Sequence, residues 1–256
     1  MNENEEKKLA IHIEDLKKNY GNKVVLKGIS LDVYEGELFG FIGKNGVGKS
    51  TTIECMLGMK TFDSGTIEIE GHDITKKALE VKELIGYVSS EPICYEDMRV
   101  YDYMEFIASI YKISEQVFEK NLTYLINRLA LSIEDLYRPI REYSHGMKQK
   151  ICLIASLIHN PKLWVLDEPT VGLDAFTSNE LCLMMKEYVA HGNTCFIASH
   201  NIDLVAKLCD RVAIINEGEI ANLIDLRKNP GFRAKLNAYF LEVCKKKETY
   251  DPKSSF

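Results

Sequence analysis

A glycine-rich loop between an apolar run and a helical pattern constrains this chain more than any other feature. The stretch FIGKNGVGKST, residues 41–51, holds three glycines, two lysines and two hydroxyl side chains. It follows the apolar run LFGFI and precedes TTIECMLGM, which gives the strand, loop and helix order in which a GxxxxGKS turn binds phosphate. The alternative is a glycine turn that only ends a strand.

The physical reason for phosphate binding in such a loop is charge. Inward-turned backbone N–H groups and the N-terminus of the following helix present partial positive charge to an anion. Lys49 adds a point cation for the β and γ phosphates of a nucleotide, and the Ser50 hydroxyl is a ligand for Mg²⁺. We therefore expect the phosphates to be bound by Gly43, Lys44, Asn45, Gly46, Val47, Gly48, Lys49, Ser50 and Thr51.

Composition excludes several classes of function. The formal net charge of −6 argues against a broad nucleic-acid surface, so no nucleic-acid partner is expected. The seven cysteines show no CxxC spacing and no flanking histidine cluster, so neither a zinc site nor a redox dithiol is indicated. The charged N-terminus lacks the apolar segment of a signal peptide, and the run ICLIASLIHN is too short to span a membrane. These features predict a cytoplasmic chain.

The hydrophobic pattern predicts an α/β fold in three parts. Short alternating or β-branched runs in residues 11–42 and 66–71 indicate strands separated by glycine turns. Apolar residues three and four apart in residues 100–136 indicate helices. Strand and helix then alternate through LWVLDEP, a helix near 178–189, TCFIAS, a helix near 202–208, and RVAIIN. That order predicts a parallel sheet with covering helices, into which the middle helices are inserted.

A second motif supplies carboxylates for metal and water. The run LWVLDEP ends in Asp167 and Glu168. Asp167 at the strand end is suited to hold Mg²⁺, and Glu168 would face the γ phosphate, where a base must polarise the attacking water. The alternative is that Asp167 caps the turn before Pro169. The chain has no NKxD guanine-reading motif, which disfavours a GTPase.

The stretch YSHGMKQK, residues 143–150, lies between the helical middle and the LWVLDEP run. With it, the sequence resembles the ATP-binding cassette (ABC) family over nearly its whole length, although Tyr143, His145 and Met147 depart from the family signature LSGGQ. The resemblance implies that Ser144 and Gly146 bind the γ phosphate of an ATP molecule held on another subunit. A plain capped core helix is the alternative.

Three more positions match the family. Asp174 in PTVGLD matches the loop that couples the two ATP sites of a dimer, and His200 in CFIASHN matches the histidine that contacts the γ phosphate. Tyr20 matches the aromatic residue that stacks on adenine. Taken alone, His200 fits an ordinary strand-end histidine, and Tyr20 fits a turn tyrosine.

One position departs from the family pattern. After the run LIGYV the family usually has a glutamine that touches the metal, and here Ser90 stands in its place with Glu91 beside it. Serine is too short to reach both the metal and a partner, and a carboxylate is attracted to Mg²⁺ but repelled by phosphate. The metal ligands expected are thus Ser50, Asp167 and Ser90, with Glu91 as the alternative to Ser90.

The resemblance also implies an architecture. It is that of a P-loop NTPase (RecA-like) core with a small antiparallel β subdomain and an inserted helical subdomain. The single ATPase domain would span residues 1–230, with the core and β subdomain at about 1–90 and 159–230 and the helical subdomain at about 91–158. Residues 231–256 would form a C-terminal helix and a polar tail.

The implied function is that of the separate ATP-binding and ATP-hydrolysing subunit of a bacterial ABC-2-type exporter. ATP and Mg²⁺ would close a head-to-tail dimer with a second copy or a related subunit, with Glu168, His200 and Lys49 as the catalytic groups. A separate transmembrane permease would hold the chain on the inner face of the cell membrane and dock a helix near residues 93–111. A face that only packs on the core is the alternative there. The alternative function is a soluble ABC ATPase that remodels a cytosolic assembly, such as iron–sulfur cluster machinery.

Overall fold

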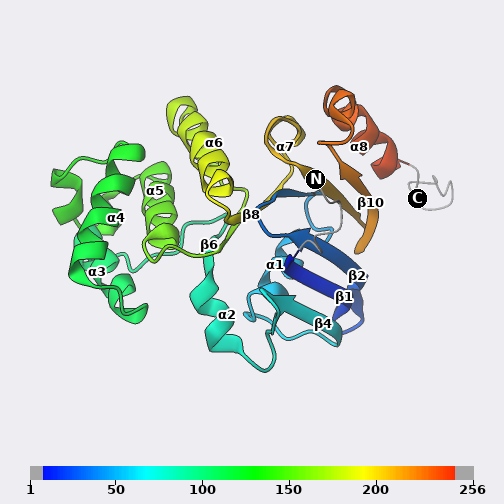
Figure 1. The fold of residues 1–256 in the computed structure, drawn as a ribbon, viewed down its shortest axis with the longest axis horizontal. Helices are drawn as coiled ribbons and strands as arrows, with labels where there is room; N and C mark the ends of the chain where they lie inside the picture. Colours follow the sequence, from blue (N-terminus) through cyan, green and yellow to red (C-terminus); the bar gives the residue numbers. More distant parts are fainter. Residues whose placement is uncertain (1–7, 246–256) are drawn as a thin grey trace, which may run out of the picture.

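Two β-sheets with one helix between them form the centre of the molecule in a computed structural model, which describes residues 8–245 (Figure 1). The first sheet has four antiparallel strands in the order β2-β1-β4-β5. Its strands are β1 (Leu9–Tyr20), β2 (Lys23–Tyr34), β4 (Ser64–Ile69) and β5 (His72–Asp73).

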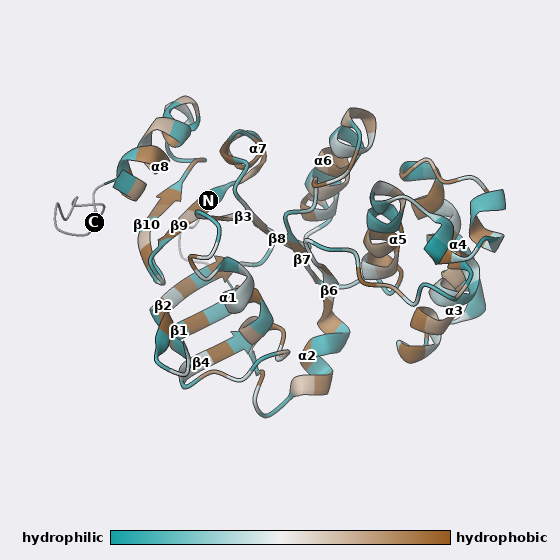
Figure 2. Ribbon diagram, turned by 180° about the vertical axis from the view of Figure 1, so that it is seen from behind, coloured by the Kyte–Doolittle hydropathy of each residue, from teal (hydrophilic) through white to brown (hydrophobic). Residues whose placement is uncertain are grey.

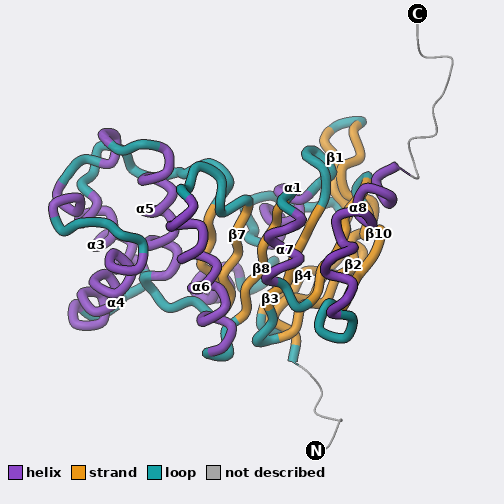
Figure 3. The backbone as a smooth tube through the Cα atoms, turned by 90° about the horizontal axis from the view of Figure 1, so that it is seen from above, coloured by secondary structure: helices purple, strands orange, loops and turns teal. Residues whose placement is uncertain are grey.

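The second sheet has six strands in the order β10-β9-β3-β8-β7-β6. Five of them are parallel, and β10 pairs with β9 in the antiparallel direction. Figure 3 shows the neighbouring strands β3, β8 and β7 of this sheet side by side. The strands are β3 (Leu38–Ile42), β6 (Ile85–Val88), β7 (Leu163–Asp167), β8 (Thr194–Ser199), β9 (Arg211–Asn216) and β10 (Glu219–Asp225).

Burial explains why the two sheets have different sequences. Every residue of β3, β7, β8 and β9 is buried, because both faces of the parallel sheet are covered, and these strands are apolar except at their ends. In β1 and β2, buried residues alternate with exposed or half-buried ones along much of each strand, as in a sheet with one wet face (Figure 2). Gly28, with φ +118°, lies inside β2 rather than in a turn between strands.

Helix α1 (Lys49–Met56) lies between the sheets. One apolar cluster joins Ile53 and Met56 of this helix to the inner face of the antiparallel sheet and to Phe39, Phe41 and Phe196 of the parallel sheet. A second cluster covers the opposite face of the parallel sheet with the remaining large helices. The phosphate loop therefore ends in a helix that is held on both sides by core.

Three helices and two short 3₁₀ turns between β6 and β7 form one side of the molecule (Figure 1). Their buried residues, among them Met104, Leu122 and Ile154, continue the second cluster. The helices are α3 (Val100–Ile110), α4 (Glu115–Arg128) and α5 (His145–Leu157), with the turns η1 (Glu134–Tyr137) and η2 (Ile140–Glu142).

The other helices cover the sheets or link their strands. The predicted helix at 202–208 coincides with its observed bounds, whereas the one predicted near 178–189 starts three residues earlier, at Ala175. The elements are α2 (Ala78–Leu84), α6 (Ala175–Ala190), α7 (Ile202–Leu208), η3 (Pro230–Lys235) and α8 (Leu236–Lys245). The polar tail predicted beyond α8 lies outside the described residues. Among the described helices, none combines the length and the apolar character that a membrane span requires.

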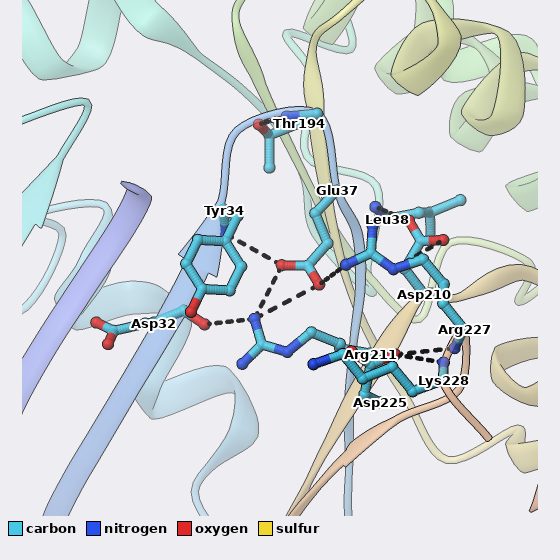
Figure 4. Close-up of polar contacts among 11 residues, drawn as sticks. Asp32, Tyr34, Glu37, Leu38, Thr194, Asp210, Arg211, Asp225, Arg227 and Lys228 are labelled. Atoms are coloured by element: carbon cyan, nitrogen blue, oxygen red, sulfur yellow. Dashed lines mark hydrogen bonds and ion pairs between the residues drawn. The ribbon is translucent and has the colours of Figure 1, made fainter. Parts of the chain in front are cut away.

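A buried ionic network holds the start of β3 to β9 and to the end of β10 (Figure 4). Glu37 is 1% exposed, and its carboxylate lies 3.1 Å from Arg211 and 3.5 Å from Arg227. It also accepts a hydrogen bond from the Tyr34 backbone N–H at 3.0 Å. Burial raises the pKa of Glu37, and the backbone bond and the two arginines oppose that rise. This network lies at the amino end of the parallel strands, away from the phosphate loop at their carboxyl end.

Candidate active site

The phosphate loop leaves β3 at Ile42 and enters α1 at Lys49. Its turn depends on Gly48, which has φ +114° and sits so close to β2 that a Cβ would lie 2.6 Å from Leu26. Gly43 is equally restricted, because a Cβ there would lie 2.7 Å from the Ile215 carbonyl oxygen. No other residue type fits these two positions without strain.

Lys49 is 6% exposed and is folded back over the loop. Its ammonium donates hydrogen bonds to the carbonyl oxygens of Gly43 at 2.8 Å and Lys44 at 3.2 Å, and lies 3.9 Å from a Glu168 oxygen. Burial lowers the pKa of Lys49, and the negative charges of Glu168 and Asp167 oppose that shift. The loop thus concentrates one cation and a helix N-terminus at one point.

Asp167 ends β7 beside Ser50, the second residue of α1. The Ser50 hydroxyl donates to one carboxylate oxygen of Asp167 at 2.8 Å. Asp167 is only 2% exposed, and its other carboxylate oxygen is buried and has no hydrogen-bond partner within residues 8–245. Burial raises the pKa of Asp167. A hydroxyl and an unused carboxylate oxygen side by side are the donor set that Mg²⁺ prefers, so the residues fit this ion.

Glu168 follows with φ +49°, a left-handed conformation that is uncommon for glutamate. One carboxylate oxygen accepts hydrogen bonds from the His200 backbone N–H at 2.8 Å and lies 2.7 Å from the His200 ring. The other accepts from the Ser199 hydroxyl at 2.9 Å. The carboxylate is therefore fixed at the ends of two neighbouring strands, facing the loop.

These groups surround one cavity of about 410 Å³. Ser90 and Glu91, which stand where the family usually has a glutamine, both line the cavity. The cavity lining therefore does not decide which of the two is the metal ligand. The remaining predicted residues of the lining come from the phosphate loop, the two carboxylates and His200. The full lining is Asn45, Gly46, Gly48, Lys49, Ser50, Thr51, Ser90, Glu91, Asp167, Glu168, Val171 and His200.

Ser144 and Gly146 are absent from the lining of that cavity. Ser144 is the exposed N-cap of α5, and its hydroxyl accepts a 3.4 Å hydrogen bond from the Met147 backbone N–H. Gly146 packs against the next loop so closely that a Cβ would lie 2.4 Å from the Gly172 carbonyl oxygen. The signature residues thus present a helix N-terminus to solvent.

Asp174 and Tyr20 also lie outside the cavity lining. Asp174 caps α6 and accepts hydrogen bonds from the Thr177 backbone and hydroxyl, each at 2.8 Å, which lower its pKa. Tyr20 is 43% exposed at the end of β1, and the ammonium groups of Lys18 and Lys60 lie over its ring, 5.1 and 5.5 Å from the ring centre. The partly exposed ring therefore has two cations against it.

Sequence reasoning missed Ser199. Its hydroxyl donates to Glu168 and accepts from the Asn201 backbone N–H at 3.0 Å, so it connects the carboxylate to the start of α7. The signal in the sequence was a hydroxyl residue directly before His200 at the end of an apolar strand.

Comparison with known proteins agrees with this geometry. The family model described as "ABC transporter" matches residues 26–171. The chain is 36% identical over 210 residues to the linearmycin resistance ATP-binding protein LnrL of Bacillus subtilis, covering 82% of this chain and 67% of that one. It is 34% identical over 210 residues to the lantibiotic transport ATP-binding protein SrtF of Streptococcus pyogenes, covering 82% and 88%.

Solved structures show the same fold. An ATP-binding subunit of an ABC transporter superposes with a TM-score of 0.85 at 27% identity, covering 91% of this chain and 99% of that one. The expected α/β fold class is therefore confirmed. The glycine-wrapped Lys49, the paired carboxylates and the matched family model together identify the chain as a member of the ABC transporter family, in which it is an ATP-binding ATPase subunit.

Proposed function

We propose that the cavity binds the triphosphate of ATP with Mg²⁺, using the loop residues 43–51 for the phosphates. The observation that carries the proposal is the buried oxygen of Asp167 that has no hydrogen-bond partner among residues 8–245 and lies beside the Ser50 hydroxyl. A buried carboxylate oxygen without a partner is costly, and a divalent cation would satisfy it. Lys49 would exchange its two carbonyl contacts for phosphate oxygens, which offer it full negative charge.

Glu168 is assigned as the group that orients and polarises the attacking water. Its oxygens are fixed by Ser199 and the His200 backbone, and it lines the same cavity as Lys49 and Ser50. His200 lies at the rim, with its side chain 57% exposed and its ring against Glu168. It would contact the γ phosphate when the nucleotide is bound. The Mg²⁺ supplies charge neutralisation of the phosphates.

We further assign the working unit as a head-to-tail dimer of this chain with a second copy or a related subunit. Ser144 and Gly146 lie outside the lining of the chain's own cavity. Ser144 is the exposed N-cap of α5, so the N-terminus of this helix faces solvent. A helix N-terminus is a favourable place for phosphate charge. In the dimer these residues would cover the γ phosphate held by the partner, and Tyr20 would stack on adenine. Asp174, on the adjoining loop, would link the two sites.

The partner that this ATPase drives is assigned as a separate transmembrane permease. A second cavity, of about 460 Å³, lies between α3, α5 and β6, with Tyr103, Ile107 and Tyr111 in its wall. Ile93 in its lining is 77% exposed, and Ile110 nearby is 56% exposed. We call this cavity the groove. Its apolar wall and exposed aliphatic rim suit one amphipathic cytosolic helix of the permease. Docking there would hold the chain on the inner face of the membrane.

Export is the direction we propose, since LnrL is named for linearmycin resistance and SrtF for lantibiotic transport. The test of the partner is co-purification of the tagged chain from detergent-solubilised membranes, followed by identification of the bound proteins. A multi-span protein should be recovered, and Ile93→Asp should release it without changing ATP binding. Recovery of soluble partners alone would contradict the permease assignment and favour a remodelling ATPase.

The test of the nucleotide site is direct. Lys49→Ala should weaken ATP binding by about 10-fold or more, because Lys49 is the buried ammonium that lines the cavity and would pair with phosphate. Lys186→Ala is the control, since Lys186 is exposed on α6 and outside the cavity lining. Equal affinities of wild type and Lys49→Ala by calorimetry would remove the loop from the phosphate-binding role.

A further inference from the structure

Two cysteine thiols meet beside the groove. Cys94 lies in the loop between β6 and α3, and Cys152 lies on α5, yet their sulfur atoms are 3.7 Å apart. Cys94 is half-buried, whereas Cys152 is 8% exposed and lines the groove wall. Because the two are far apart in the sequence, spacing gave no sign of a dithiol.

The two thiols have different acidities. The contact with the Cys152 thiol lowers the pKa of Cys94, with the Lys148 ammonium contributing. The same contact, with burial, raises the pKa of Cys152. The thiolate is the reactive form of cysteine, so Cys94 is the nucleophile of the pair and Cys152 the resolving thiol.

We propose that Cys94 and Cys152 are a reversible oxidation site that closes to an intrachain disulfide with a peroxide as oxidant. The Cys94 thiolate attacks one peroxide oxygen and breaks the O–O bond, which leaves a sulfenic acid and, after protonation, one water. Cys152 then attacks the Cys94 sulfur, the S–S bond forms, and the sulfenic oxygen leaves as a second water. Both thiols are oxidised, and the peroxide is reduced.

The geometry permits closure. A disulfide needs its sulfur atoms about 2 Å apart. Cys152 is fixed in the middle of α5, so Cys94 has to move, and it belongs to an irregular loop rather than to a strand or helix. The bridge would tie the loop of residues 89–98 to α5.

The loop is a sensitive place for a bridge. Glu91, three residues before Cys94, lines the nucleotide cavity. Ile93, the residue directly before Cys94, lines the groove. Oxidation would therefore hold the loop of residues 89–98, which joins these two cavities, in one position. Among the other described thiols, Cys55, Cys195 and Cys209 have no exposed surface, so a peroxide does not reach them.

Non-reducing peptide mapping after mild hydrogen peroxide treatment tests the site. Trypsin releases Cys94 in peptide 83–99 and Cys152 in peptide 151–162, each with one cysteine. We expect these two peptides to appear linked, with loss of both free thiols, and to separate again with a thiol reductant. Cys182→Ser is the matched control, because Cys182 is also 8% exposed, and it should leave the linked pair unchanged.

Two variants and one further measurement sharpen the test. In Cys152→Ser, oxidation should stop at a Cys94 sulfenic acid that a dimedone reagent traps, and in Cys94→Ser no linked pair should form. In the oxidised wild type, amide hydrogen exchange in residues 89–98 should slow, and reductant should reverse the change. Peptides 83–99 and 151–162 that stay unlinked after Cys94 oxidises, or linked peptides without slower exchange, would overturn the proposal. Neither readout depends on ATP binding or on the permease.

Discussion

Two buried carboxylate sites lie at opposite ends of the parallel sheet and are built in contrasting ways. At the amino end, Glu37 is met by two arginines and a backbone N–H. At the carboxyl end, Asp167 has one oxygen bonded to Ser50 and one without a partner in the described chain. Burial raises the pKa of both groups. The difference is that the first carboxylate is satisfied inside the protein, whereas the second has an oxygen left for a ligand.

This contrast separates residues that hold the fold from residues that hold a ligand. Removing one partner from a satisfied buried ionic network leaves the others uncompensated and destabilises the protein. Removing a carboxylate whose oxygen has no partner relieves a desolvation cost and affects the ligand instead.

Glu37→Ala should give the largest change, a loss of about 3 kcal/mol or more in the free energy of unfolding, because Arg211 is left buried without its counter-charge. Chemical denaturation monitored by circular dichroism measures it. Glu35→Ala is the matched control: Glu35 is exposed two residues away and should cost about 0.5 kcal/mol or less. Equal losses for the two variants would contradict the structural role of the network.

Glu168→Gln should lower the rate of ATP hydrolysis by on the order of 100-fold or more, because an amide does not take a proton from water. Nucleotide affinity should be retained, and the ATP-bound dimer should accumulate, as measured by phosphate release and light scattering. Ser199→Ala, which removes only the hydrogen bond that orients Glu168, should lower the rate by about 10-fold. Unchanged phosphate release in Glu168→Gln would remove this carboxylate from the base role.

Asp167→Asn should behave in the opposite way to Glu37→Ala. The free energy of unfolding should stay the same or rise, because the buried charge is removed and the Ser50 hydroxyl keeps an acceptor. The increase in ATP affinity on adding Mg²⁺ should shrink by about 10-fold, since the metal loses a charged ligand. Calorimetric titration with and without Mg²⁺ measures this. If Mg²⁺ raised the ATP affinity of Asp167→Asn as much as that of the wild type, Asp167 would not be a metal ligand.

How far the sequence predicted these sites follows from how local each one is. The phosphate loop lies within nine consecutive residues, and Asp167 and Glu168 lie at the carboxyl end of one strand. Both could therefore be predicted from the local sequence pattern, because the carboxyl ends of parallel strands lie at the same edge of the sheet. The Glu37 network and the Cys94–Cys152 contact were not, because each joins segments whose meeting depends on strand order and helix packing. The choice between Ser90 and Glu91 stays open for a similar reason: both residues line the cavity.

A third ionisable group, the half-buried His159, tests whether burial of a titratable side chain without a counter-charge makes stability depend on pH. His159 stacks on Tyr111 with ring centres 3.7 Å apart, and one ring nitrogen lies 3.1 Å from the Ile85 carbonyl oxygen. The other ring nitrogen is buried without a partner within residues 8–245. Burial lowers the pKa of His159 to about 4, and the hydrogen bond to Ile85 opposes it only in part.

The sign of the pH dependence follows. Well above pH 6.5 the imidazole is neutral in both states and adds no pH dependence. As pH falls from about 8 toward 4, the unfolded chain binds a proton that the folded chain does not, so stability falls, by roughly 2 kcal/mol between pH 8 and 5. His159→Gln should remove that part of the slope in urea denaturation curves, whereas His191→Gln, at an exposed histidine, should keep it. If His159→Gln kept the full pH dependence of the free energy of unfolding, burial of this imidazole would not be the source of that dependence. The link between burial and the energetics of a charged group, argued from Glu37 and Asp167, would then not extend to the groove that His159 lines.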